Sequence, residues 1–178
     1  MQGLQWDGND IAVKYGYLDV KALYRALDEK RRSRGMSWMQ VQKEIARPGA
    51  THPISVATIR GTETGRTTEA DGILAMVRWL GMTFQDFSVG VVDPVSSSPL
   101  SAAGMRRFDA RAFYSALDFE RQRRNFSWKQ FVEQEFPGWS PAMFTGLAKG
   151  GRMGASKVVA LAAFLRRSPE SFTHATTY

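Results

Sequence analysis

The chain has 178 residues, a net charge of +7 and no cysteine, which excludes disulfides and thiolate metal sites. Its two histidines, His52 and His174, lack the spacing of a metal site. No run of about 18 apolar residues is present and the amino terminus is too polar for a signal peptide, so the sequence predicts a cytoplasmic protein without a membrane segment.

Residues 1–18 form the first predicted element. Ile11, Val13, Tyr15 and Tyr17 alternate with other residues, and this period of two is typical of a strand or an extended segment. We therefore expect a short extended N-terminal arm. The arm is expected to pack on the first helix, and the alternative is an arm that grips DNA or a partner.

Residues 19–87 are predicted to be helical throughout. Val20, Leu23 and Leu27 form an apolar stripe at helical spacing, and Gly35 is a natural helix stop. Ser37 and Ser55 are good N-caps for two further short helices. A fourth helix is expected through residues 73–80, and a single turn follows up to residue 87.

Residues 88–108 are predicted to be a flexible linker because they are small and include two prolines. About 20 such residues span roughly 25 Å as a coil and up to about 65 Å when stretched. That range includes the roughly 34 Å between half-sites one turn apart on DNA.

Residues 109–172 repeat the first unit, and residues 173–178 are left as a tail. At an offset of 90, residues 19–41 and 109–131 share 11 of 23 residues, where about one or two would match by chance. The identities resume at an offset of 85, from Ser55/Ser140 to Phe87/Phe172. A duplicated unit with a variable joint indicates two tandem domains.

Each repeat is separately basic. Residues 19–87 carry 11 Lys and Arg against 8 Asp and Glu, and residues 109–172 carry 10 against 6. This distribution suits a polyanionic partner, although soluble proteins that bind no anion can also be basic. The basic clusters at 30–34 and 121–124 are interpreted first as solvated helix ends.

The capped helix pairs resemble the Cro/phage-repressor type helix-turn-helix, the XRE family. The segments that carry the resemblance are MSWMQV (36–41), SVATIR (55–60) and GR (65–66) in the first repeat, and FSWKQF (126–131), SPAMFT (140–145) and GGR (150–152) in the second. The resemblance implies an all-α protein with two tandem five-helix, repressor-like helix-turn-helix domains. It also implies a transcriptional regulator that binds double-stranded DNA in a sequence-specific manner, with the two domains acting as a covalent pseudo-dimer.

By the same resemblance, the third helix of each repeat would enter the major groove and the loop after it would contact phosphates. The residues so assigned are Ser55, Ala57, Thr58, Arg60, Arg66, Ser140, Ala142, Met143, Thr145, Lys149 and Arg152. Arg60 is the strongest individual candidate, because a guanidinium can bind guanine in a bidentate manner. The simpler interpretation of Ser55 and Ser140 is that they cap their helices, and that of the loop cations is a solvated basic loop.

Other functions remain open from the sequence. Trp38, Trp128 and the few hydrogen-bond donors of the second copy's third helix favour a protein-interaction or antitoxin-like adaptor, with a homodimer or another protein as its partner. The two tryptophans are expected to be partly buried core residues rather than a stacking platform for single-stranded nucleic acid. No catalytic set or phosphate-loop motif is found, so neither an enzyme, a cofactor nor a small-molecule substrate is expected.

Overall fold

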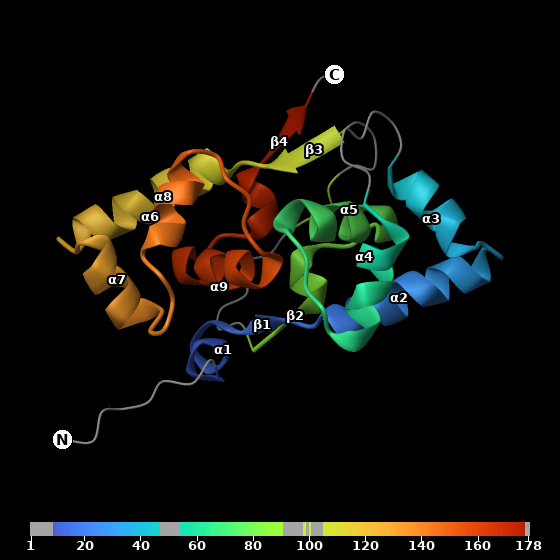
Figure 1. Cartoon of the computed structure of the whole chain (residues 1–178), viewed down its shortest axis with the longest axis horizontal. Coiled ribbons are helices and arrows are strands. Elements are labelled where there is room, and N and C mark those ends of the chain that lie inside the picture. Colours follow the sequence, from blue (N-terminus) through green and yellow to red (C-terminus); the bar gives the residue numbers. More distant parts are fainter. Residues whose placement is uncertain (1–8, 47–53, 91–97, 99, 101–104, 177–178) are drawn as a thin grey trace.

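The computed structural model describes residues 9–46, 54–90, 98, 100 and 105–176. Within these ranges the chain forms nine α-helices, three short 3₁₀ helices and two small two-stranded sheets. The protein was predicted to be all-α; the described residues are mostly helical, with two small sheets in addition (Figure 1). None of the helices in the described ranges is long and apolar enough to cross a membrane.

The first repeat, residues 19–87, contains four α-helices and two 3₁₀ turns. They are α2 (Val20–Ser33), α3 (Trp38–Ile45), α4 (Val56–Gly61), η1 (Thr62–Thr64), α5 (Ala70–Leu80) and η2 (Phe84–Phe87). Asp19 begins α2 by accepting the Ala22 N–H at 2.9 Å, and Gly35 follows its end with a φ of 61°, as predicted. Ser37 caps α3 through a reciprocal capping box with Gln40.

The second repeat, residues 109–172, contains the equivalent four α-helices and the last 3₁₀ turn, but no 3₁₀ turn at the position of η1. They are α6 (Ala110–Arg123), α7 (Trp128–Glu135), α8 (Ala142–Ala148), α9 (Ala155–Leu165) and η3 (Pro169–Phe172). Asp109 and Ser127 repeat the caps of Asp19 and Ser37. Ser140 departs from its interpretation as a cap: its hydroxyl accepts the Ala142 N–H at 3.3 Å, but the N-cap of α8 is Pro141.

Strands occupy the ends of the intervals that were predicted to be linker and tail. β1 (Tyr17–Leu18) pairs with β2 (Ser88–Val89), and β3 (Met105–Phe108) pairs with β4 (Thr173–Thr176), both antiparallel. The prediction of a linker over 88–108 and a tail over 173–178 is corrected at these strands. Ladder hydrogen bonds join backbone groups, so these two-to-four-residue strands leave little trace in the side-chain pattern. Most of the predicted linker lies outside the described residues.

The two repeats pack directly against each other through α5 and α9. The Ala70 N–H donates to the Met153 carbonyl at 2.9 Å, and the Ala155 N–H donates to the Thr68 carbonyl at 2.9 Å. The two bonds are equivalent: at the offset of 85, Ala70 corresponds to Ala155 and Met153 corresponds to Thr68. The repeats are therefore related by a local two-fold axis at this bridge. In the same way β1 contacts α9, and β3 contacts α5.

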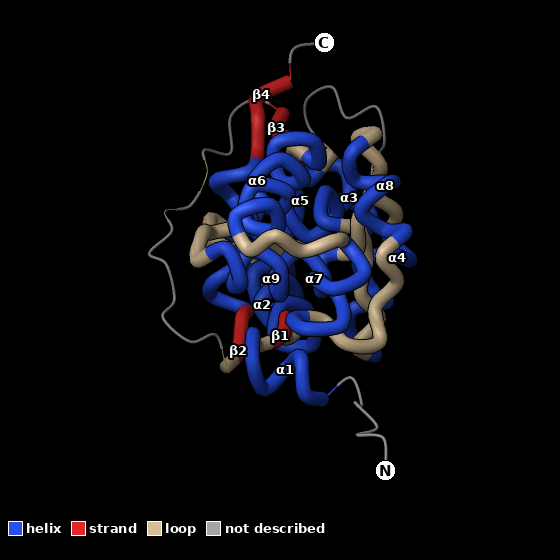
Figure 2. Tube along the Cα trace, turned by 90° about the vertical axis from the view of Figure 1, so that its left-hand side faces the viewer, coloured by secondary structure: helices blue, strands red, loops and turns tan. Residues whose placement is uncertain are grey.

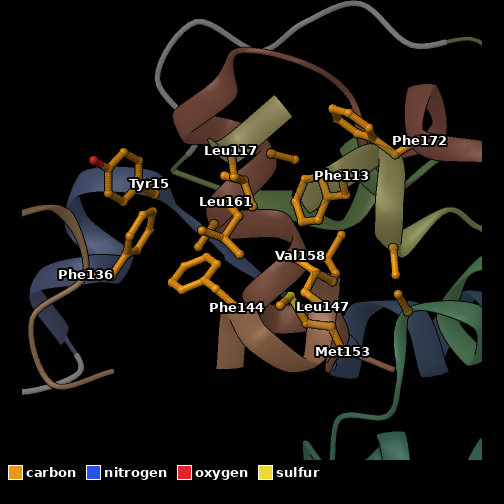
Figure 3. Close-up of a cluster of buried hydrophobic side chains, with 14 of the residues drawn as sticks. Tyr15, Phe113, Leu117, Phe136, Phe144, Leu147, Met153, Val158, Leu161 and Phe172 are labelled. Carbon is orange, nitrogen blue, oxygen red and sulfur yellow. The ribbon is translucent and has the colours of Figure 1, made fainter. Parts of the chain in front are cut away.

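The hydrophobic cores also cross the boundary between the repeats. Ala70 of the first repeat belongs to the core of the second, and Ala155 and Val159 of the second belong to the core of the first. Figure 3 shows the second core, in which Phe113, Phe144 and other buried side chains converge around α9. The exchange of core residues makes the repeats one packed body.

Of the N-terminal arm, the structure describes residues 9–18, and these differ from the prediction in part. Tyr17 and Leu18 are extended, in β1, but residues 9–15 form a helix, α1 (Asn9–Tyr15), which packs on α9 of the second repeat. Ile11 and Tyr15 are buried whereas Val13 is 75% exposed. The buried residues are four apart, the spacing of one helix face. The apolar alternation that suggested a strand depended on Val13, which lies between them in sequence but faces solvent.

Tyr15 anchors α1 to the second repeat. Its ring stacks on Phe136 with centroids 4.9 Å apart (Figure 3), and its hydroxyl donates to Glu135. Lys14 forms an ion pair with the same carboxylate at 2.6 Å, and Arg124 does so at 2.7 Å. Burial opposes ionisation of Glu135, but these donors and cations outweigh it and lower its pKa.

Glu170 forms a further contact between the repeats. It is 6% exposed, and its Oε1 accepts the Phe84 N–H of the first repeat at 2.6 Å. Its Oε2 is buried with no hydrogen-bond partner among the described residues. Burial raises the pKa of Glu170, and the Asp86 charge adds to that shift. The two-fold equivalent of Phe84 is Pro169, which has no N–H. The equivalent bond in the other direction, from residue 169 to Gln85, therefore cannot form.

Candidate nucleic-acid interface

The helices α4 and α8 are equivalent in the two repeats and lie on the same side of the molecule, the right-hand side in Figure 2. Each is followed by a loop that reaches the two-fold bridge, where Glu69 and Gly154 pair. The buried residues of each helix hold it against its core: Ile59 on α4, and Phe144 and Leu147 on α8. The opposite side of each helix is therefore open to solvent.

Of the residues predicted at α4, one caps the helix and others are exposed to solvent. The Ser55 hydroxyl accepts the Thr58 N–H at 3.0 Å and lies 2.8 Å from the Thr58 hydroxyl. Ser55 therefore caps the helix, as its simpler interpretation held. Ala57 and Arg60 are exposed beside it. In the described ranges Arg60 forms no ion pair, so its guanidinium is available to a ligand.

Of the predicted residues at α8, Ala142 and Thr145 on the helix and Ser140 just before it are exposed. Met143 is partly buried and packs against the core of the second repeat, so most of its side chain is not available to a ligand. The face of α8 thus offers two hydroxyl groups and no charge, whereas α4 offers Arg60.

The loop cations differ in their availability. Arg66 and Lys149 are exposed and form no ion pair within the part of the chain that the structure describes. Arg152 is exposed too, but it bonds Glu69 of the other repeat at 3.2 Å and so ties the two loops together. Of the three predicted loop contacts, two are free and one contributes to the contact between the repeats.

One acidic side chain lies beside the first of these surfaces. Glu63, in η1, is exposed and lies close to Tyr24. The pKa of the Tyr24 phenol is raised, mainly by burial and in addition by the charge of Glu63. Its equivalent in the second repeat is Ala148. Neither α4 nor α8 is surrounded by carboxylates in the described ranges.

Two cations that the sequence reasoning missed belong to the same side. Lys21 of α2 and Arg111 of α6 are equivalent, exposed and without an ion pair in the described ranges. The Cε of Lys21 lies 3.2 Å from where a β-carbon on Gly65 would stand, and the Nε of Arg111 lies 3.3 Å from the same point on Gly150. In the sequence, the signal for this pair is that both copies have a basic residue at this position.

The basic clusters at the ends of α2 and α6 are largely neutralised. Asp28 pairs with Arg31 at 2.6 Å and with Arg32 at 2.7 Å, and Arg34 pairs with Glu44 at 2.5 Å. The second repeat has equivalent or similar pairs in Arg121–Asp118, Arg123–Glu120 and Arg124–Glu135. These clusters therefore belong to the solvated helix ends that were expected.

The two tryptophans are partly buried, as expected. Trp38 stacks on Tyr24 with centroids 5.4 Å apart, and Trp128 stacks on Phe144 at 4.1 Å. Both join the second helix of their repeat to its neighbours.

The part of the chain that is described holds no group of three or more acidic or histidine side chains able to bind a metal ion. No family model, curated protein or solved structure matches this chain.

Proposed function

We propose that this protein is a DNA-binding transcriptional regulator in which α3–α4 and α7–α8 are helix-turn-helix units of the Cro/phage-repressor type. In this proposal α4 and α8 enter the major groove of double-stranded DNA, and the protein acts in the cytoplasm. The observation that carries the proposal is the placement of two equivalent, exposed helices on one side of a single packed body (Figure 2). Within the described residues, Arg60 on α4 and Arg66 and Lys149 in the loops after the two helices are exposed and form no ion pair.

The two-fold relation between the repeats determines the kind of site that is expected. Helices related by a two-fold axis meet the two strands of a duplex in opposite directions, so the half-sites should be inverted. The direct contact of α5 with α9 should also fix their spacing. The half-sites need not be identical, because α4 carries Arg60 where α8 carries Thr145.

Selection of bound duplexes from a random pool tests both points. We expect two short motifs in inverted orientation at one spacing. Direct repeats, or motifs at many spacings, would contradict the rigid two-fold arrangement. If no duplex is enriched and a random duplex shows no mobility shift at low salt, the DNA-binding function itself is wrong.

Arg60→Ala is expected to weaken binding to the selected site by about 1–3 kcal/mol, the range for a good bidentate base contact. Binding to random DNA should fall much less, because a base contact contributes little there. Thr145→Ala, at the equivalent position of α8, is the matched control and should have the smaller effect. Titration of labelled duplexes by fluorescence anisotropy measures both. An equal loss on both duplexes would make Arg60 a phosphate contact.

A protein-interaction or antitoxin-like adaptor is the second candidate. Met39 and Phe119 favour it, because these large apolar side chains are 62% and 66% exposed and exposed apolar surface often marks a protein interface. The adaptor would show no mobility shift with any duplex at low salt.

A further inference from the structure

Lys21 and Arg111 combine three properties that the other basic residues of their helices do not share. They are exposed, they occupy equivalent positions in the two repeats, and they have no ion pair within the described ranges. By contrast, the cations at the far ends of α2 and α6 are held by carboxylates, such as Arg32 by Asp28 and Arg123 by Glu120.

Each of the two cations lies over a glycine in the loop that follows α4 or α8. Gly65 and Gly150 have φ values of 83° and 82°, a left-handed conformation that suits glycine. Because neither glycine has a side chain, Lys21 and Arg111 approach within 3.2 and 3.3 Å of the β-carbon position. The cation is thereby held beside the loop, on the side of the molecule that carries α4 and α8.

The same arrangement has survived in both copies although the residues themselves changed. The first copy has Lys21 where the second has Arg111, so both are positively charged. Four residues further on, Arg25 is matched by the uncharged Ser115. A retained positive charge with no carboxylate partner indicates an anionic ligand outside the chain. An Arg and a Lys can both bind a phosphate as a charge, whereas a base contact would depend on their different geometries.

We propose that Lys21 and Arg111 bind one DNA backbone phosphate each, beside α4 and α8, and so position the two helices in their grooves. This inference rests on the proposed function and adds two contacts that carry no sequence information. Because each lies beside the loop after one of the two helices proposed to enter a single duplex, both would act on that duplex.

The test is the salt dependence of duplex binding by the whole chain. Each phosphate contact contributes about 0.9 to the slope of log affinity against log salt concentration. The double variant Lys21→Gln/Arg111→Gln should therefore lower that slope by roughly 1.8, and it should weaken binding to selected and random duplexes by the same factor. The double variant Lys21→Arg/Arg111→Lys keeps both charges and should retain the slope.

The matched control is Arg32→Gln/Arg123→Gln. It removes the same two charges from the same two helices, at side chains that are 73% and 65% exposed. Its slope should stay close to that of the unchanged protein. If the two glutamine variants have equal slopes, net charge alone accounts for the effect and the inference is overturned, while DNA binding stands. If the unchanged protein binds no duplex at low salt, both proposals fail.

Discussion

The two repeats have the same backbone plan but fill it with different side chains. The first core contains Leu23 and Ile59 where the second contains Phe113 and Phe144, and all four are fully buried. The caps are the same: Asp19 and Asp109 begin the first helices in the same way. The comparison teaches that the caps and the spacing of apolar positions determine this fold, whereas the volume at each position can change if its neighbours change too.

Truncation of the equivalent core residues is the strongest way to test that comparison. Phe144→Ala should destabilise the protein by about 3–5 kcal/mol and Ile59→Ala by about 2–5 kcal/mol, because each leaves a cavity in a packed core. Urea unfolding followed by circular dichroism measures both.

Both variants should unfold in a single transition, because the two cores share residues across the boundary. Two separate transitions would show that the repeats are independent domains and would contradict the packed arrangement.

The N-terminal helix is the clearest difference between the repeats, because α1 covers the second and not the first. Tyr15→Ala should cost about 3 kcal/mol, since it removes a buried, stacked ring that is 8% exposed. Tyr15→Phe removes only the hydroxyl bond to Glu135 and should cost about 1 kcal/mol.

Tyr17→Ala is the control for this comparison. Tyr17 is 49% exposed, and its loss should change the free energy of unfolding by no more than about 0.5 kcal/mol. Equal effects at positions 15 and 17 in thermal or urea unfolding would show that α1 is not anchored by Tyr15.

Glu170 tests the asymmetry at the contact between the repeats. Glu170→Gln keeps the acceptor for the Phe84 N–H and removes a buried carboxylate, so it should stabilise the protein at neutral pH. We expect a gain on the order of 1 kcal/mol, because the folded protein no longer has to hold an ionised carboxylate away from water. The amide that replaces Oε2 still has no partner among the described residues, so the gain comes from the charge alone. Gln85 is the residue equivalent to Glu170. Gln85→Glu should not stabilise the protein, because the equivalent of Phe84 is Pro169, which has no N–H to donate.

The pH dependence of this gain follows from the raised pKa of Glu170. Below the ordinary value of about 4.3, the carboxyl is neutral in both the folded and the unfolded chain, and the gain should be small. It should grow as the pH rises from there to the raised pKa and then level off, because in that interval the unfolded chain ionises while the folded protein keeps its proton. A gain that does not change between pH 4 and pH 8 would show that the charge is not its cause.

The sequence predicted well what local signals encode. Ser37 and Ser127 mark helix starts by their side chains, and Gly35 marks an end, so the order of helices within each repeat could be read directly. Ser55 was recognised as a cap for the same reason, whereas the same signal at Ser140 misplaced the cap of α8, which is Pro141.

It failed where distant parts of the chain decide the outcome. The bridge between the repeats is made by backbone groups at Thr68, Ala70, Met153 and Ala155, which leave no mark in the side chains. The helical state of α1 depends on Phe136 and Glu135, about 120 residues away. Of the candidate interface, the exposed residues of α4 were predicted, but Lys21 and Arg111 were missed. They are single cations at the starts of α2 and α6, away from the basic clusters at the ends of these helices, and only the fold brings them beside Gly65 and Gly150.

The local two-fold axis within one chain has a consequence for how this protein can evolve. In an ordinary homodimer, a single gene change appears on both subunits and alters both at once. Here a change at Arg60 leaves Thr145 untouched, so each half can acquire its own chemistry while the bridge at 68–70 and 153–155 preserves the symmetry of the frame.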